Sequence, residues 1–470
     1  MSRRFLRIGV FVIAMALLAA ACGDDDDAAT TTAAPTTTAA SSTTEAPTTT
    51  AAPTTTAASS TTEAPTTTEA AGFSCGDGVT VGVITDLTGS LAIYGAHINR
   101  SVPVGFAYAT GGEAQTTPEQ TYMLGDCEIR VVFKDDQSNA ELSGTAAREL
   151  IEVEGASIII GSVSSGVTAT LQGIARENDV ILIAAPAAAT DITGKDFDPN
   201  TFRASRTNYQ DGMAICDQFV NVDGLKTFVQ IAPDYSFGYG GAQAYRDACT
   251  YFGGEFIADD VFAPADTTDF TTFLEPFAGT DANALLVTWA GGGFVPLLQA
   301  ALDLGVIDDD TVLGSPFVDN VVMPAFFGNA IGTTSTIVYH YGSPDNAAND
   351  FLIEQDQAVF GSLPDLFDAD GMNAAIMVVE ALKATGGAAD AASLRDALEG
   401  MTFEGPKGTI EIRPEDHVAI QDMYVVTLDG FDDAGPIYTP VGTVRPEPPC
   451  LLEGDYVDRC GDLPVGSLSG

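Results

Sequence analysis

Two consecutive serines and a glycine, Ser164, Ser165 and Gly166, occur in "GSVSSG" directly before a stretch with helical periodicity. The first N–H groups of a helix have no acceptors within the helix, and the helix dipole is positive at that end. Serine hydroxyls at such a turn add further polar groups. The residues therefore indicate a subsite for an anion. The alternative interpretation is a plain N-cap that binds no ligand.

The same serines could instead suggest a nucleophile. "SVSSG" differs from the G-x-S-x-G elbow because Ser162 replaces the first glycine. A catalytic serine needs a base, and none of the three histidines lies in a loop expected to meet Ser165: His97, His340 and His417. The chain also has no H-E-x-x-H, P-loop or G-x-G-x-x-G motif. The sequence therefore predicts no catalytic residues, and an exported hydrolase is the least favoured function.

Metal and cofactor chemistry find little support. No C-x-x-C occurs, and the histidines are far from any group of cysteines. "DADG" (368–371) resembles part of a calcium loop but lacks its remaining ligands, so we interpret Asp370 as a helix N-cap. We predict neither a metal nor a cofactor.

Seven cysteines are present, and an odd number in an exported protein requires an explanation. Setting Cys22 aside leaves an even set, which an oxidising compartment would favour as disulfides. The set allows several connectivities. Pairing between sequence neighbours predicts Cys75–Cys127, Cys216–Cys249 and Cys450–Cys460.

Cys22 follows a basic head with Arg3, Arg4 and Arg7 and an apolar stretch from 8 to 21. That stretch is too short for a mature membrane span but typical of a signal peptide. With three alanines directly before the cysteine, it resembles a bacterial lipoprotein signal. The resemblance implies that Cys22 carries lipid and anchors the chain to the membrane at the cell surface or in the periplasm. An ordinary cleaved signal is the alternative.

Residues 28–71 consist almost entirely of Ala, Thr, Pro, Ser and Glu, and "AAPTTTAASSTTEAPTTT" occurs twice, at 33–50 and 51–68. Such a segment has no apolar face to bury, so we interpret it as a disordered stalk. The whole chain has a net charge of −46. This charge disfavours nucleic acid and anionic lipid as partners.

After residue 72, short β-branched runs alternate with helical patterns. Strands are predicted at 79–87, 128–136, 157–163 and 180–186, and helices at 95–108, 139–154 and 165–177. The alternation restarts after 200–212, with strands "TFVQIAPD", "GEFIADDVF", "ANALLVTWA" and "TVLGSPFVD" and helices near 238–252, 268–278, 293–304 and 322–328. A last passage begins with "TIVYHYG" (336–342) and continues with a helix near 371–385. This pattern predicts an α/β fold of two lobes, each with helices on both faces of a parallel sheet.

In open α/β sheets, ligands bind beyond the carboxyl ends of the strands. Trp289, the single tryptophan, follows such a strand in "TWAGGG". The neighbouring glycines allow close approach, so we predict that Trp289 lines the ligand site.

Several segments together resemble the branched-chain amino-acid-binding proteins, which are type I periplasmic-type solute receptors of ABC importers. They are "GVITDLTGSLAIYG", "VFKDDQSNAELSGTAARELIEVEGASIIIGSVSSGVT", "ILIAAPAAATDIT", "FRASRTNYQDG" and "APDYSFGYGG". The resemblance covers about 76–430 and implies two Rossmann-like lobes joined by crossings near 203–207, 338–342 and 413–419. The predicted organisation is a signal peptide at 1–21, an anchor and stalk at 22–72, a first lobe at 73–205 and 340–416, a second lobe at 206–339 and 417–446, and a tail at 447–470.

The resemblance also implies ligand contacts. Ser165 takes the place of the serine that holds a ligand carboxylate. Ala188 and Thr190 would supply a carbonyl and a hydroxyl from the next loop. Tyr94 matches a pocket aromatic, and Phe237, with Tyr235 as the alternative, matches a second one. Each aromatic could equally be a core residue.

The sequence departs from the family where an acid should meet the ligand's amino group. That place reads "SPF" (315–317), and the nearest acid is Asp319. A buried ammonium would lack its counter-charge, so besides the amino acid that the family implies, the solute could be an amide, a urea-like solute or a carboxylate without an amino group. The resemblance implies a small-molecule ligand, an ABC permease as partner and a monomer. A sensory receptor that presents its ligand to a signalling partner is the main alternative.

Overall fold

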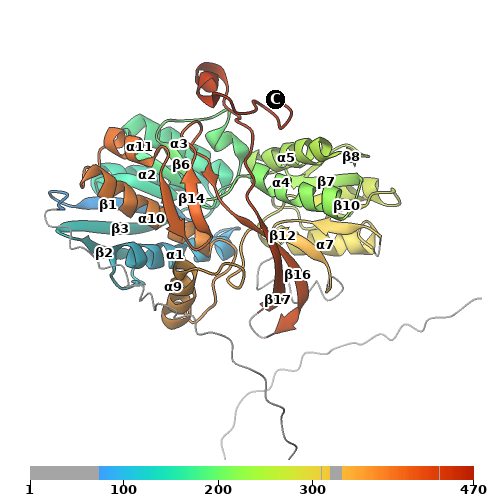
Figure 1. The fold of residues 1–470 in the computed structure, drawn as a ribbon, viewed down its shortest axis with the longest axis horizontal. Coiled ribbons are helices and arrows are strands. Elements are labelled where there is room, and N and C mark those ends of the chain that lie inside the picture. Colours follow the sequence, from blue (N-terminus) through green and yellow to red (C-terminus); the bar gives the residue numbers. More distant parts are fainter. Residues whose placement is uncertain (1–72, 309, 318–330, 433–434) are drawn as a thin grey trace, which may run out of the picture. The chain divides into compact units, whose positions relative to one another are not determined.

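A computed structural model describes residues 73–308, 310–317, 331–432 and 435–470 (Figure 1). The predicted signal peptide, Cys22, the stalk, Asp319 and the predicted helix at 322–328 lie outside these residues. The rest of the predicted α/β alternation can be compared directly with the structure.

The first lobe contains a six-stranded sheet in the order β2-β3-β1-β4-β5-β6. All pairs are parallel except β2–β3. The strands are β1 (Val79–Thr85), β2 (Glu119–Leu124), β3 (Cys127–Asp135), β4 (Ala156–Gly161), β5 (Ile181–Ala184) and β6 (Thr201–Arg203). Four were predicted. The antiparallel edge strand β2 was missed because its alternating "EQTYML" has only one buried face, with Gln120 and Tyr122 inside.

Helices cover both faces of this sheet. Alternate residues of β4 belong to different cores: Ile158 and Ile160 share one with α1 (Ala92–Thr110) and α10 (Asp368–Thr385), while Ile159 shares the other with α2 (Ala140–Arg148) and α3 (Ser165–Asn178). Continuous aliphatic strands are the expected result of burial on both faces. Helices α9 (Ala347–Gln355) and α11 (Ala391–Leu398) lie beside this lobe (Figure 1).

The first lobe is assembled from segments far apart in the sequence. Helices α1 and α10 pack so closely that a Cβ atom on Gly105 would lie 2.5 Å from the Met372 carbonyl oxygen. At the sheet edge, the Arg203 N–H donates to the His417 carbonyl at 3.2 Å. The chain therefore returns to this lobe after building the second one.

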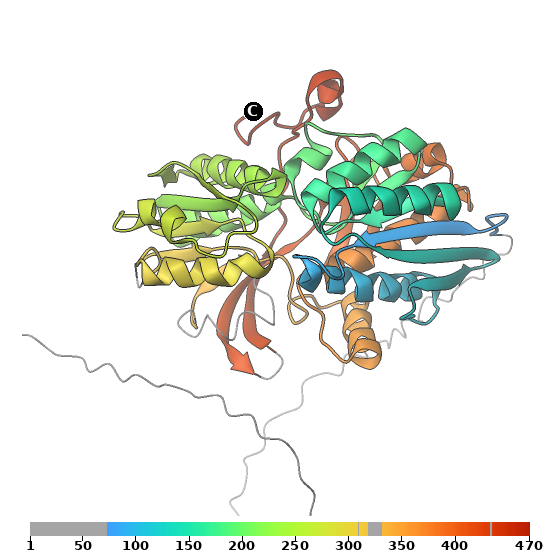
Figure 2. The same cartoon turned by 180° about the vertical axis from the view of Figure 1, so that it is seen from behind.

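The second lobe is a parallel sheet in the order β11-β10-β7-β8, with β9 also paired to β7. Its strands are β7 (Thr227–Pro233), β8 (Glu255–Phe256), β9 (Val261–Ala263), β10 (Ala284–Val287) and β11 (Val312–Gly314). "GEFIADDVF" was predicted as one strand but forms β8 and β9. Helices α4 (Asn208–Asp217) and α5 (Ser236–Phe252) cover one face, and α6 (Thr271–Leu274) and α7 (Phe294–Asp303) cover the other (Figure 2).

Two small antiparallel sheets were not predicted. One consists of β12 (Thr334–Ile337), β16 (Met423–Asp432) and β17 (Gly435–Val444), and the other of β13 (Thr402–Gly405), β14 (Gly408–Ile412) and β15 (Ala419–Ile420). Thus the strand within "TIVYHYG" pairs with β16 instead of joining a parallel sheet.

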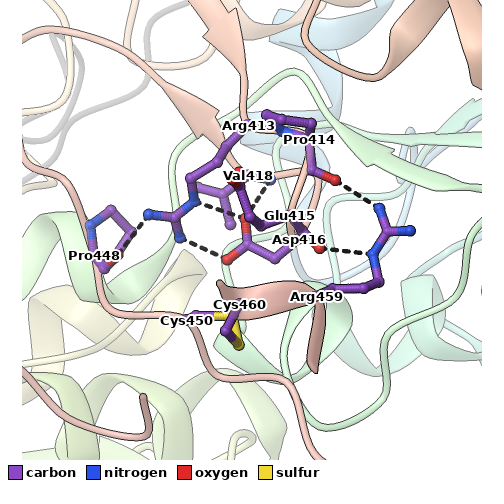
Figure 3. The surroundings of a disulfide bond; sticks show 9 residues. All are labelled: Arg413, Pro414, Glu415, Asp416, Val418, Pro448, Cys450, Arg459 and Cys460. Atoms are coloured by element: carbon purple, nitrogen blue, oxygen red, sulfur yellow. Dashed lines mark hydrogen bonds and ion pairs between the residues drawn. A yellow bond between two sulfur atoms is a disulfide. The ribbon is translucent and has the colours of Figure 1, made fainter. Parts of the chain in front are cut away.

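All three predicted disulfides are confirmed: Cys75–Cys127, Cys216–Cys249 and Cys450–Cys460. The third closes a loop in the tail, which packs against the segment 413–418 (Figure 3). Arg413 pairs with Asp416 and donates to the Pro448 carbonyl at 2.7 Å, and Arg459 donates to the Glu415 carbonyl at 2.9 Å. The tail is therefore part of the folded structure.

Candidate functional site

The serine loop connects β4 to α3. Its turn requires glycine, because a Cβ atom on Gly161 would lie 2.1 Å from the Ile84 carbonyl oxygen. Ser164 is the N-cap and Ser165 the first residue of α3. The Ser165 hydroxyl accepts a hydrogen bond from the Ala189 N–H at 3.2 Å. Since a hydroxyl can also donate one hydrogen bond, Ser165 can donate to a carboxylate placed at this helix end.

Hydrogen bonds behind the loop hold it in place. The Ser162 hydroxyl donates to Asp136, and the Ser162 N–H donates to the Thr168 hydroxyl at 3.1 Å. Asp136 is fully buried, and burial raises its pKa to about 6 despite hydrogen bonds from Ser162 and Ser138. Within the described residues, none of the three histidines hydrogen-bonds to a serine of this loop. His97 instead accepts from the Phe367 N–H at 3.4 Å.

The neighbouring loop, 185–193, is fixed by a buried cation. Arg203 donates to the Ala187 carbonyl at 2.6 Å, to the Ala189 carbonyl and to the Thr193 hydroxyl at 2.8 Å. Burial, together with the nearby charge of Arg206, lowers the Arg203 pKa to about 9. Ala188, predicted to offer its carbonyl to a ligand, accepts from the Asn208 N–H at 2.8 Å. Thr190 begins a short 3-10 helix and is buried.

Aromatic side chains from both lobes meet near the loop 185–193, to which Arg206 and Asn208 connect them. Ring centroids are 5.1 Å apart for Tyr94 and Phe367, 5.9 Å for Phe367 and Phe317, and 6.0 Å for Phe317 and Phe237. Tyr235 continues the row, 6.0 Å from Phe237. The first four residues belong to the same apolar cluster as Val163 and Ala188 of the two loops. We call Tyr94, Phe237, Phe317 and Phe367 the aromatic row.

A second buried cation, Arg206, lies against this row. Its guanidinium is 5.2 Å from the ring centroids of both Phe317 and Phe367. It also donates to the Pro186 carbonyl at 3.1 Å and pairs with Asp211 at 3.2 Å. Sequence reasoning missed Arg206, Phe317 and Phe367 as site residues. Arg206 lies in "FRASRTNYQDG", which carries the family resemblance, and Phe317 lies in "SPF", where an acid is missing, but neither segment indicated a role for these side chains.

The row is closely packed. The second-lobe residues around it leave no room for a water molecule: Asn208, Asp211, Phe237, Gly241, Tyr245, Thr288, Pro316 and Phe317. Two hydrogen bonds also hold the elements around the row together. Asn208 donates to the Phe237 carbonyl at 2.6 Å, and the Gly291 N–H donates to the Tyr94 hydroxyl at 3.4 Å.

Trp289 lies in the core of the second lobe. It is 1% exposed and packs edge-to-face on Phe270, with centroids 4.8 Å apart. Its Nε1 is buried without a hydrogen-bond partner in the described part of the chain. The interpretation of Asp370 as an N-cap was wrong: Phe367 is the cap, and Asp370 lies inside α10.

The acids near the described aromatic row differ in their partners. Asp370, three residues after Phe367 in α10, is buried and neither of its carboxylate oxygens has a hydrogen-bond partner among the described residues. The "SPF" segment places Phe317 where an acid was expected, and Asp319 lies outside the described residues. Asp211 is paired with Arg206. Asp86 accepts hydrogen bonds from the Leu91 N–H at 2.8 Å and from Gly89 and Ser138.

The described residues contain no group of His, Cys, Asp or Glu side chains suited to hold a metal ion. No helix among these residues has both the length and the apolar character that crossing a membrane requires.

Comparison with known proteins supports the resemblance. Residues 78–435 match the family described as "Periplasmic binding protein". The Leu/Ile/Val-binding protein homolog 6 of Brucella abortus is 26% identical over 370 residues, which cover 76% of this chain and 89% of that protein.

Solved structures agree. An ABC-type branched-chain amino acid transporter protein from Rhodopseudomonas palustris is 31% identical with a TM-score of 0.64, covering 78% of this chain and 96% of that one. A solute-binding protein of an ABC transporter from the same species, solved with benzoate, is 25% identical with a TM-score of 0.66, covering 79% and 98%. The chain therefore belongs to the periplasmic binding protein family, as an extracytoplasmic solute-binding protein of the ABC transporter type.

Proposed function

We propose that this protein captures a small carboxylate that carries an aromatic ring and no α-amino group, and delivers it to an ABC permease. The observation that carries the proposal is the aromatic row, contributed by both lobes, near the loop 185–193 that is hydrogen-bonded to Ser165. A ring stacks well among aromatic side chains at centroid distances of about 4.5–7 Å. The carboxylate would accept from the Ser165 hydroxyl and the first N–H groups of α3.

Two further observations support this class of solute. Asp211 and Asp86 are already engaged by Arg206 and by hydrogen bonds from Leu91 and Ser138, so neither offers a free counter-charge to an ammonium, whose burial without one is costly. The relative from Rhodopseudomonas palustris with 25% identity was solved with benzoate, a ring-bearing carboxylate without an amino group. The side chains of leucine-like amino acids could pack against the aromatic row, but their ammonium group would need a carboxylate that Asp211 and Asp86 do not offer.

We further propose that lipid on Cys22 holds the protein at the membrane, and that it acts as a monomer without a cofactor. A sensory receptor would bind its ligand between two lobes in the same way. Neighbouring genes for a permease and an ATPase would indicate transport, and a neighbouring gene for a sensor kinase would indicate sensing. Catalysis is disfavoured because no base contacts Ser165 among the described residues.

A ligand panel tests the proposal. Benzoate, 4-hydroxybenzoate, phenylacetate, phenylalanine and leucine are added to the protein at equal concentrations, and the shift in unfolding temperature is measured. A ligand at 100 times its dissociation constant stabilises by about 2.7 kcal/mol. We expect the aromatic acids to stabilise and the two amino acids to have little effect. Stabilisation by leucine alone would contradict the proposed solute class.

A further inference from the structure

Two glycines of the second lobe lie where its backbone touches the first lobe. The first is Gly240, inside α5. A Cβ atom at this position would lie 2.9 Å from the Thr190 hydroxyl oxygen and 3.2 Å from the Thr190 nitrogen. The contact partner is thus the backbone of the ligand loop 185–193, which Arg203 holds rigidly. An added methyl group would have to displace the Thr190 hydroxyl and push the Thr190 backbone away by a few tenths of an ångström, which moves the helix and the loop apart.

The second glycine is Gly291, in the turn after β10. A Cβ atom there would lie 2.9 Å from the Ser90 carbonyl oxygen and 2.9 Å from the Leu91 side chain. Its N–H donates to the Tyr94 hydroxyl at 3.4 Å, so this contact bears directly on the aromatic row. The residue also has a φ of +78°, which itself favours glycine.

We propose that Gly240 and Gly291 are positioning residues that determine how closely the lobes approach, and thereby how tightly a solute is held. Neither has a side chain that could contact the solute. Instead, their missing side chains allow helix α5 to reach Thr190 and the β10–α7 turn to reach Ser90. A wider separation at either point draws Phe237 and Phe317 away from Ser165 and Tyr94. The inference rests on the proposed capture of a solute between the lobes.

The chain offers matched controls. Gly173 lies within helix α3 and a Cβ there would meet only the end of the Arg176 side chain, at 4.0 Å, so Gly173→Ala controls for Gly240→Ala. Gly279 has a φ of +72° and nothing within 4 Å of its would-be Cβ, so Gly279→Ala controls for the backbone strain of Gly291→Ala. Alanine inside a helix has a higher propensity than glycine, so helix destabilisation cannot explain a loss at Gly240.

The first measurement is the affinity for the best solute of the panel, by calorimetry, with dissociation rates by stopped flow. We expect Gly240→Ala and Gly291→Ala to weaken binding at least fivefold through faster dissociation, while both controls stay within twofold of wild type. Affinities equal to those of the controls would overturn the inference.

The second measurement needs no solute. Amide hydrogen exchange is followed by mass spectrometry in the peptides that contain 88–95 and 186–193. Both glycine variants should increase exchange in their facing peptide relative to the controls, Gly240→Ala at 186–193 and Gly291→Ala at 88–95. If wild type binds nothing in the panel but exchange increases in the two glycine variants, the proposed solute class fails, while the inference that these glycines set the approach of the lobes (the docking inference) stands. Exchange equal to that of the controls overturns the docking inference, whatever the panel shows.

Discussion

The two lobes present different chemistry to the candidate site. The first lobe offers two rings of the aromatic row, Tyr94 and Phe367, and in addition polar groups held by hydrogen bonds. Ser165 is bonded to Ala189, and Arg203 fixes the carbonyls on either side of Ala188. The second lobe offers Phe237 and Phe317, which meet their neighbours through ring contacts. A hydrogen-bonded frame recognises one charged group in one place, whereas packed rings accept a range of shapes. We infer that the first lobe fixes the carboxylate and the second selects the rest of the solute.

The largest effect is expected at the frame of the first lobe. In Arg203→Leu, two carbonyls and one hydroxyl lose their donor, and each unpaired buried acceptor costs about 1–3 kcal/mol. We expect the free energy of unfolding to fall by about 3–5 kcal/mol and binding to be abolished. Urea denaturation measures the first and calorimetry the second. Arg176→Leu, whose side chain is 63% exposed, is the control. Unchanged binding in Arg203→Leu would show that the frame is not needed.

The second prediction concerns the pH dependence of the same frame. Because burial raises the pKa of Asp136 to about 6, the folded state holds this proton more firmly than the unfolded state. Its stabilising contribution is complete below about pH 4 and is lost as the pH rises to about 6, amounting to about 2–3 kcal/mol. Urea denaturation at pH 4 and pH 7 should show a loss of stability that is smaller in Asp136→Asn than in wild type by this amount, because other buried acids with raised pKa values, such as Asp368 and Asp370, contribute equally in both proteins. Equal pH dependence in both proteins would contradict the assignment.

The third prediction tests the second lobe. Phe317→Ala removes the central ring of the aromatic row, and loss of a central aromatic contact costs about 2 kcal/mol or more. We expect roughly 30-fold weaker binding of an aromatic acid and a smaller preference over aliphatic acids, measured by calorimetry. Phe256→Ala is the control, because its ring packs on Phe228 and Arg246, within the second lobe. An unchanged preference would show that the second lobe does not select the solute.

The smallest effects are expected when single polar side chains are changed. Ser165→Ala removes a hydrogen bond to a charged group, worth about 1.5–3 kcal/mol, so binding should weaken at least tenfold. Asp319→Asn should change binding less than threefold, since we propose that no ammonium is bound. Two calorimetric titrations give both values. A large loss of affinity in Asp319→Asn, with leucine-like ligands preferred, would contradict the proposed solute class and indicate an amino-acid receptor.

Much of the fold follows from local sequence, because β-branched runs with helices between them are typical of parallel sheets. The missed strands have other causes. β2 is buried on one face only, and β12 to β17 pair antiparallel, so their registers depend on contacts between distant segments.

The position of Ser165 at the start of α3 was predictable from a local motif, while its contact with a solute stays a prediction. The roles of Arg203, Arg206 and Phe367 depend on which segments meet in three dimensions, and no local pattern reveals that. Trp289 illustrates the opposite difficulty. A residue after a strand can reach the ligand edge or turn into the core, and here its side chain is buried against Phe270.

The return of the chain to the first lobe has a consequence for export. The second-lobe sheet and its helices come from one continuous stretch, from α4 to β11, whereas α1 of the first lobe packs on α10, which follows much later. A chain that crosses the membrane N-terminus first can complete the second lobe while the α1 side of the first sheet still lacks its partner helix. That half-built lobe exposes aliphatic surface and is the species most open to aggregation or proteolysis. The disulfide Cys75–Cys127 joins residues that both precede the second lobe, so it can form during this interval.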